Sequence, residues 1–367
     1  MGKDETESEN IGINKPFDPT KIKVETKQMS LDTLIKRMKE GEIDLSPDFQ
    51  RNEVWKQESK SRLIESLLIR IPLPAFYMDA TNEDKWVVVD GLQRLSTLRD
   101  FIITEDDKNR IILSDLEFLV DLNNTGFKDL PRNYQRRIEE TQVTVYLIEK
   151  GTPSNVKFNI FKRINTGGLP LSAQEIRHAL NQGAVTNLLK ELAQSPEFQE
   201  ATAHGIRDQR MSDRECILRF FAFVLTPYSS YNSTKDFDSF LSEAMELMND
   251  MSAQNLENYK KRFLRAMKNA SAIFSNKAFR KQTRQKSGGY PINKALFESW
   301  SVNLDKLTDQ ELSYLEKNKD KIHEAFITLM EDQEFVNAVT QGTGSSTRVQ
   351  KRFESIERLI ANILQQG

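Results

Sequence analysis

The spacing of hydrophobic residues divides the chain into a mixed first half and a helical second half. Up to about residue 182, short β-branched runs alternate with segments in which apolar residues recur every three or four positions. This pattern predicts strands interleaved with helices. Beyond it, strand signals almost vanish, and helical periodicity predicts six or seven helices. We therefore expect an α+β protein, with a mixed domain over residues 21–182, an all-α domain over residues 183–367 and a polar, disordered tail over residues 1–20.

The most informative stretch of the mixed half is Trp86–Phe101, WVVVDGLQRLSTLRDF. Its β-branched start predicts a buried strand, and the apolar spacing from Leu95 onward predicts a helix. The first amides of a helix lack acceptors within it and lie at the positive end of the helix dipole, so such a turn can bind an anion. The turn between strand and helix holds four candidate residues: Asp90, Gly91, Gln93 and Arg94.

The residues of this turn alone are compatible with two explanations. In the functional one, Gly91 allows close backbone approach, Arg94 contacts a phosphate with two hydrogen bonds, and Asp90 holds a metal, a ribose hydroxyl or a water. In the structural one, the aspartate caps the helix, the glycine makes the turn and the arginine pairs with a carboxylate. A guanidinium locked in an internal ion pair would argue against the functional explanation.

Two further loops carry candidate binding residues. In Ile43–Trp55, a proline and polar residues predict a loop anchored by its aromatic side chains, which would hold Gln50 and Arg51 at a fixed place. An arginine on an anchored loop is well placed for recognition, but an ordinary surface ion pair is an equal alternative. The second loop lies between two predicted helices and consists of Asn165, Thr166, Gly167 and Gly168.

For this second loop a helix C-cap is favoured over a phosphate cradle, because a glycine pair commonly ends a helix. Ser172 and Glu175 follow with the spacing of a capping box, which predicts the start of the next helix. In the early turns of that helix, His178 is expected to be a hydrogen-bonded structural residue.

Residues 258–297 carry eleven lysines or arginines and no aspartate or glutamate. Because the whole chain has a net charge of −2, such a block suggests a local surface for nucleic acid. The alternative is a solvated helix face whose charge is balanced by acidic residues nearby in space. The residues that would contact DNA are Lys260, Lys261, Arg262 and Arg265.

Composition narrows the class of protein. With 38% hydrophobic and 29% charged residues, the chain is typical of a globular protein. One cysteine excludes an internal disulfide and a cysteine-rich zinc site, and the three histidines are too far apart for a common metal motif. No apolar run approaches the length of a membrane span. We expect a cytoplasmic protein without a membrane partner, and the sequence leaves its oligomeric state open.

Three stretches occur in an order that resembles a known family: PDFQRNEVW, VVVDGLQRLSTLRDF and FKRINTGGLPLSAQEIRHAL. Together they resemble the N-terminal domain of GmrSD-type modification-dependent restriction systems and related antiphage proteins. The resemblance spans roughly residues 25 to 225 and implies a ParB/sulfiredoxin-like fold. It also implies that the Asp-Gly-x-Gln-Arg turn binds and hydrolyses a nucleoside triphosphate. The chain has Leu92 where the family often has glutamine, and this apolar side chain either weakens nucleotide binding or packs into the core.

The resemblance implies a separate role for each residue of the site. Asp90, directly or through Mg²⁺, would orient the attacking water, and Gln93 would position that water or a phosphate oxygen. Arg94 and the turn amides would hold the phosphates, together with the Phe-Gln-Arg and Asn-Thr-Gly-Gly loops. We therefore expect a nucleotide-binding, NTP-hydrolysing sensor or regulatory subunit of a defence system.

Many relatives also carry an HNH-like nuclease, which needs a clustered histidine and metal ligands. No such cluster is evident here, so we expect any cutting to come from a partner protein. Two alternatives stay open: a DNA-binding module without turnover, and a protein-interaction scaffold with a degenerate turn.

Overall fold

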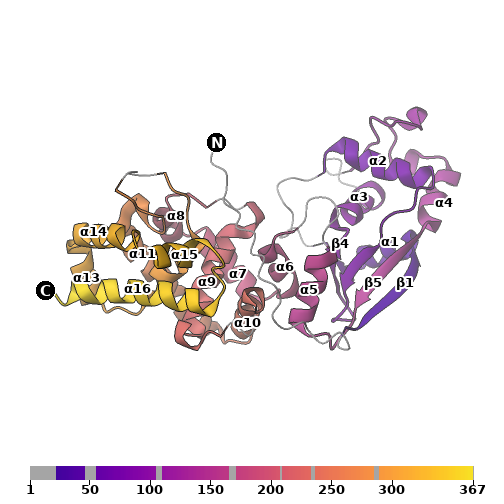
Figure 1. Cartoon of the computed structure of the whole chain (residues 1–367). Helices are drawn as coiled ribbons and strands as arrows, with labels where there is room; N and C mark the ends of the chain where they lie inside the picture. The colour runs from indigo at the N-terminus through magenta and orange to yellow at the C-terminus, as the bar shows by residue number, and fades with distance from the viewer. Residues whose placement is uncertain are drawn as a thin grey trace. The chain divides into compact units, whose positions relative to one another are not determined.

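The computed structural model describes residues 22–45, 55–104, 110–164, 171–206, 209–232, 236–284 and 289–366. The chain forms two compact units, Phe17–Leu180 and Asn181–Gly367. The first contains a five-stranded sheet with helices, and every regular element described in the second is helical (Figure 1). The α+β class, with an all-α C-terminal part, is confirmed.

The sheet of the first unit is mixed, with the strand order β1-β5-β3-β4-β2. β5 lies between antiparallel β1 and parallel β3, and β4 lies between antiparallel β3 and parallel β2. Period-two alternation in QVTVYLI correctly predicts the full extent of β5. The strands are β1 Val24–Ser30, β2 Ile43–Asp44, β3 Phe76–Asp79, β4 Trp86–Asp90 and β5 Gln142–Ile148.

Helices cover both faces of this sheet. One face packs with α1 to α4 into the larger core of the unit, which includes Val145 of β5 and Leu98 of α3. The other face packs Val89 and Ile148 against α5 and α6 (Figure 1). The helices are α1 Leu31–Lys39, α2 Gln57–Leu68, α3 Leu92–Ile102, η3 Val120–Leu122, η4 Phe127–Asp129, α4 Arg132–Glu140, α5 Ser154–Ile164 and α6 Ala173–Leu180.

The second unit is organised around a buried helix, α12. Its ten residues from 295 to 304 are all buried, as expected for a helix surrounded by others. Ten α-helices, more than predicted, are present in the described part of this unit. They are α7 Ala184–Ala193, α8 Pro196–Thr202, α9 Ser212–Leu225, α10 Phe237–Asn249, α11 Ala253–Phe274, α12 Lys294–Asp305, α13 Asp309–Lys317, α14 Lys319–Leu329, α15 Gln333–Thr340 and α16 Ser346–Leu364, with the short turns η5 Gln209–Met211, η6 Tyr228–Ser230 and η7 Ser275–Lys277.

A chain of ion pairs, buried except at Lys294, links α9, α12 and α16 of this second unit. Glu298 of α12 accepts hydrogen bonds from Arg352 Nε at 2.9 Å and from Arg219 Nη1 at 3.2 Å. Arg219 also donates to Glu215 at 2.8 Å, and Glu215 accepts from Lys294 at 2.7 Å. Because each buried charge has an opposite partner, the chain avoids the large penalty of an isolated buried ion.

Among the described residues, no helix combines the length and apolar character that crossing a membrane requires.

A single buried carboxylate fixes an irregular segment of the first unit. The side chain of Glu65 in α2 accepts three consecutive backbone N–H groups, from Glu117 at 3.1 Å, Phe118 at 2.7 Å and Leu119 at 2.9 Å. Burial raises the pKa of Glu65, but these backbone hydrogen bonds outweigh it and leave the pKa below its ordinary value. The ionised carboxylate therefore stabilises this loop.

We predict that Glu65→Gln lowers the free energy of unfolding by about 1–3 kcal/mol at neutral pH, because an amide cannot accept all three bonds. In the wild type this contribution is present in full above the ordinary glutamate pKa of about 4.3 and is lost as the pH falls through the lowered folded pKa. Denaturant unfolding from pH 7 to pH 3 measures it. Glu58→Gln, at an exposed position of the same helix, is the control; equal losses in the two variants would contradict the prediction.

Candidate functional site

The Asp-Gly-x-Gln-Arg segment forms the predicted turn between a strand and a helix. β4 ends at Asp90, Gly91 adopts a left-handed conformation with φ +96°, and α3 begins at Leu92. The first helical hydrogen bond runs from Leu95 N–H to Gly91 O at 2.9 Å. The amides of residues 92 to 94 precede that bond, so they have no acceptor within the helix.

Gly91 is required by its surroundings as well as by its backbone angle. A Cβ atom at this position would overlap the ring of Phe76, the first residue of β3. The left-handed conformation is also unfavourable for residues with a side chain. The turn can therefore lie directly against β3 only because position 91 has no side chain.

Arg94 is held inside the unit by several partners. Its Nη2 atom donates to Asp90 Oδ2 at 2.9 Å and to Ala75 O at 3.1 Å, and its Nη1 atom donates to Pro74 O. The guanidinium lies over the ring of Phe76, with Cζ 4.6 Å from the ring centroid. Burial lowers the pKa of Arg94, and the neighbouring Asp90 opposes that shift.

The side chain of Arg94 is only 10% exposed, whereas that of Asp90 is 29% exposed. We expected Arg94 to hold phosphates, but in this structure its guanidinium clamps the end of β4 to the segment before β3. The carboxylate is therefore the more exposed group of the pair, and the guanidinium fixes its Oδ2 atom. The structural explanation of Arg94 is thus the one that the geometry supports.

Tyr77 is a neighbour of Asp90 that sequence reasoning missed. The two residues pair across β3 and β4, while Met78 pairs with Val88, so β4 contains one extra residue. Such a bulge re-aims the side chains beside it. The ring of Tyr77 stacks on Tyr146 with centroids 4.7 Å apart. Burial raises the pKa of Tyr77, with Tyr146 and Asp90 adding to the effect.

The two remaining positions of the turn have different roles. Gln93 is partly exposed, and its Oε1 atom accepts the Trp55 N–H at 3.5 Å, which ties the turn to the end of the loop that precedes α2. Leu92 packs against the larger core of the unit. Of the two explanations for a leucine here, packing into the core is therefore confirmed.

Both candidate loops lie outside the described residues, namely Gln50 and Arg51 in the first loop and Asn165, Thr166, Gly167 and Gly168 in the second. The predicted capping box after the second loop is present: Glu175 N–H donates to Ser172 Oγ at 3.1 Å, and Ser172 N–H donates to Glu175 Oε2 at 2.5 Å. His178 is buried in the same helix.

Half of the described cations of the basic block, five of ten, form ion pairs with acidic residues. Lys260 contacts Glu191 at 2.5 Å, and Arg284 contacts Glu331 at 3.0 Å. Lys261 is exposed, and no ion pair with another described residue is seen for it. For the paired residues, a solvated helix face balanced by acidic neighbours has the stronger support. The two arginines proposed to contact DNA, Arg262 and Arg265, pair with Asp305 at 2.5 Å and Asp309 at 2.6 Å, respectively.

A pair that the sequence did not indicate lies on the sheet beside α5. The Lys157 ammonium is 2.9 Å from Asp79 Oδ2 at the end of β3, and both side chains are about nine-tenths buried. Lys157 also donates to Thr81 Oγ1. The partners are 78 residues apart, so no local spacing could have indicated this contact, which fixes α5 on the sheet.

Within the described ranges, no group of three or more histidine, cysteine, aspartate or glutamate side chains could hold a metal ion. Within those ranges Asp90 belongs to no such group, and a single carboxylate suits a Mg²⁺ ion held mainly by phosphates and water. The one cysteine, Cys216, is buried in the second unit, and burial raises the pKa of its thiol to about 12. A thiolate nucleophile is therefore not favoured at neutral pH.

Comparison with known families finds a match within the first unit. Residues 31–181 match the family described as GmrSD restriction endonuclease, N-terminal domain. The match includes the Asp-Gly-x-Gln-Arg turn and ends at Asn181, the first residue of the helical unit. No curated protein matches the chain significantly.

A comparison of two glycines separates the stability cost of crowding Phe76 from the cost of backbone strain. Gly41 also has a positive φ, of +74°, but a Cβ there would meet nothing within 4 Å. We predict that Gly41→Ala costs about 1 kcal/mol of stability through strain alone. Gly91→Ala should cost a further ~1–3 kcal/mol, because the buried ring cannot move freely. Equilibrium urea unfolding compares the variants, and equal losses would show that the turn does not need this contact.

Proposed function

The first unit carries a GmrSD-type N-terminal domain, and from this premise we propose that the protein is a nucleotide-binding, NTP-hydrolysing sensor or regulatory subunit of a restriction or antiphage defence system. The observation that carries the proposal is the turn itself. It presents a fixed, partly exposed carboxylate next to the amides that open a helix. The resemblance to the family and the geometry of the turn both support this turn as the binding site.

In this proposal the phosphates bind at the start of α3. The amides of residues 92 to 94 and the positive end of the helix dipole favour a negative charge there. Gln50, Arg51 and the loop Asn165–Gly168 would complete the site, as the resemblance implies. Because Arg94 is committed to internal partners, it acts as a positioning residue, and Arg51 would supply the positive charge.

Asp90 would orient the attacking water. Its Oδ2 atom accepts the hydrogen bond from Arg94 at 2.9 Å, which fixes the carboxylate without help from the ligand. Because the carboxylate is already held in place, it does not have to reorient during the reaction. Gln93, tied to the Trp55 amide, would position the same water or a phosphate oxygen. When bound, Mg²⁺ would neutralise charge on the phosphates, with Asp90 as its ligand from the protein.

The internal ion pair of Arg94 also favours a second candidate function. If the turn only fixes β4 to the segment before β3, the unit is a protein-interaction scaffold that has the family's fold without its chemistry. DNA binding through residues 260–265 has weaker support because of the acidic partners described above. Under either function, a separate nuclease of the defence system remains the proposed partner.

We predict that the purified chain hydrolyses at least one of ATP, GTP, CTP and UTP with Mg²⁺. Asp90→Asn should lower turnover at least about 100-fold, because an amide is a poor proton acceptor and metal ligand. Asp84→Asn, an exposed substitution in the turn between β3 and β4, is the control and should leave turnover unchanged.

Thermal unfolding checks that the Asp90→Asn variant is folded, and calorimetry measures its nucleotide affinity. Equal turnover in the wild type and in Asp90→Asn would remove the catalytic role of this carboxylate. If the wild type binds none of the four nucleotides, the scaffold function is favoured instead.

A further inference from the structure

An irregular loop of the first unit exposes apolar side chains at a rigid tip, which we define as residues 115–121. Phe118 is 70% exposed and Val120 58% exposed, the two highest values for large apolar residues in the described part of the chain. Single exposed apolar residues are common, but these two are only two positions apart in the chain. Three exposed carboxylates flank them in the sequence, Asp115, Glu117 and Asp121, and Glu117 is paired with Arg62 at 2.8 Å.

Hydrogen bonds between two side chains and the backbone of the tip fix its conformation. The Glu65 carboxylate binds three of its amides, and Asn123 Oδ1 accepts a fourth, from Leu116, at 3.2 Å. The ends of the loop are joined by hydrogen bonds between Leu113 and Asn124 at 2.8 Å and between Leu113 and Thr125 at 3.0 Å. An aromatic side chain on a rigid support loses little conformational freedom on binding, which is the property of an interface anchor.

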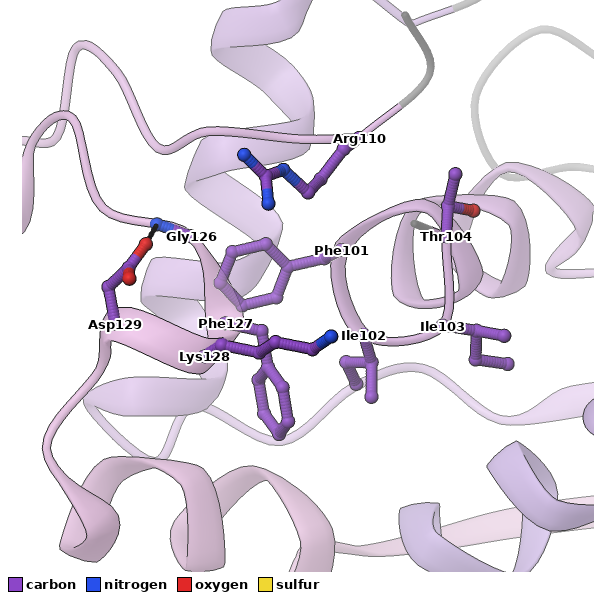
Figure 2. Close-up of a pocket in the computed structure, with 9 residues that line it drawn as sticks. All are labelled: Phe101, Ile102, Ile103, Thr104, Arg110, Gly126, Phe127, Lys128 and Asp129. Atoms are coloured by element: carbon purple, nitrogen blue, oxygen red, sulfur yellow. Dashed lines mark hydrogen bonds between the residues drawn. The ribbon is translucent and has the colours of Figure 1, made fainter. Parts of the chain in front are cut away.

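A hollow with complementary chemistry lies at the base of the same loop. It is lined by the C-terminal end of α3 and by residues 126–129, and its empty volume is about 430 Å³ including the open mouth. Figure 2 shows the rings of Phe101 and Phe127 together in it, and these rings meet edge to face with centroids 5.8 Å apart.

Cationic side chains lie around this apolar lining. Arg110 and Lys128 are both exposed and both line the hollow (Figure 2). Asp129 also lines it, and its carboxylate accepts the Gly126 N–H at 3.1 Å. The tip thus offers apolar groups flanked by carboxylates, and the hollow offers the partly exposed ring of Phe127 beside two cations. Complementary charge of this kind helps interfaces select their partners.

We infer that the first unit binds a second copy of this chain, with the Phe118 tip of one copy in the Phe101–Phe127 hollow of the other. The tip and the hollow are parts of one loop region, so two copies related by a two-fold axis can exchange tips reciprocally. Each dimer would then contain two identical contacts. The buried surface is small, so the association is weak and depends on concentration.

Analytical ultracentrifugation of the full chain tests this inference over a range of about 1 to 200 µM, which brackets the affinity of small interfaces. The wild type should shift from monomer to dimer within this range. Phe118→Ser should weaken association at least about tenfold, as expected for an interface anchor, and Lys128→Glu should also weaken it. Leu247→Ser, which removes an exposed apolar side chain in the second unit, is the control and should behave as the wild type.

Mixing the two variants gives the sharpest result. Phe118→Ser keeps its hollow and Lys128→Glu keeps its tip, so a mixed pair contains one intact contact and one contact that is damaged on both sides. An equimolar mixture should therefore associate more strongly than the weaker of the two variants alone. A wild type that stays monomeric would overturn the inference. So would an unchanged dimer in Phe118→Ser, or a mixture no stronger than the weaker variant. Thermal unfolding confirms that each variant is folded.

Discussion

The ion pair between Arg94 and Asp90 is the interaction on which the geometry of the proposed site depends. The guanidinium joins the end of β4, the first turn of α3 and the carbonyls that precede β3. Removing it would leave the carbonyls of Pro74 and Ala75 without this donor and Asp90 without its fixed partner. In the proposed site the arginine of the motif is therefore a positioning residue, and the carboxylate and the helix amides would be the groups that meet a ligand.

Features set by local sequence were predicted well. The alternation in β5, the capping box of Ser172 and Glu175 and the glycine at position 91 depend on residues within a few positions of one another, and the structure has each of them. Helix number was predicted less well, because short helices follow one another closely: only Asn318 separates α13 from α14. Apolar periodicity continues across such a break, so the pattern alone suggests one longer helix.

Features that depend on distant partners could not be predicted from the sequence. Arg94 finds its carbonyl acceptors at Pro74 and Ala75, about twenty positions earlier. In the basic block, Arg262 meets Asp305 about forty positions later, and Lys260 meets Glu191 about seventy positions earlier. In both cases the sequence shows which residues are charged, but only the fold shows which groups they pair with. A charged residue in a motif is therefore weak support for a ligand contact until its neighbours are known.

Hydrogen–deuterium exchange of the peptide that spans residues 86–95, with and without an equimolar mixture of the four nucleoside triphosphates and Mg²⁺, tests the central claim most directly. If phosphates bind at the turn, the amides that open α3 become protected, because a bound anion accepts their hydrogen bonds. Exchange that is identical in the two conditions, at nucleotide concentrations well above any plausible dissociation constant, would contradict the account.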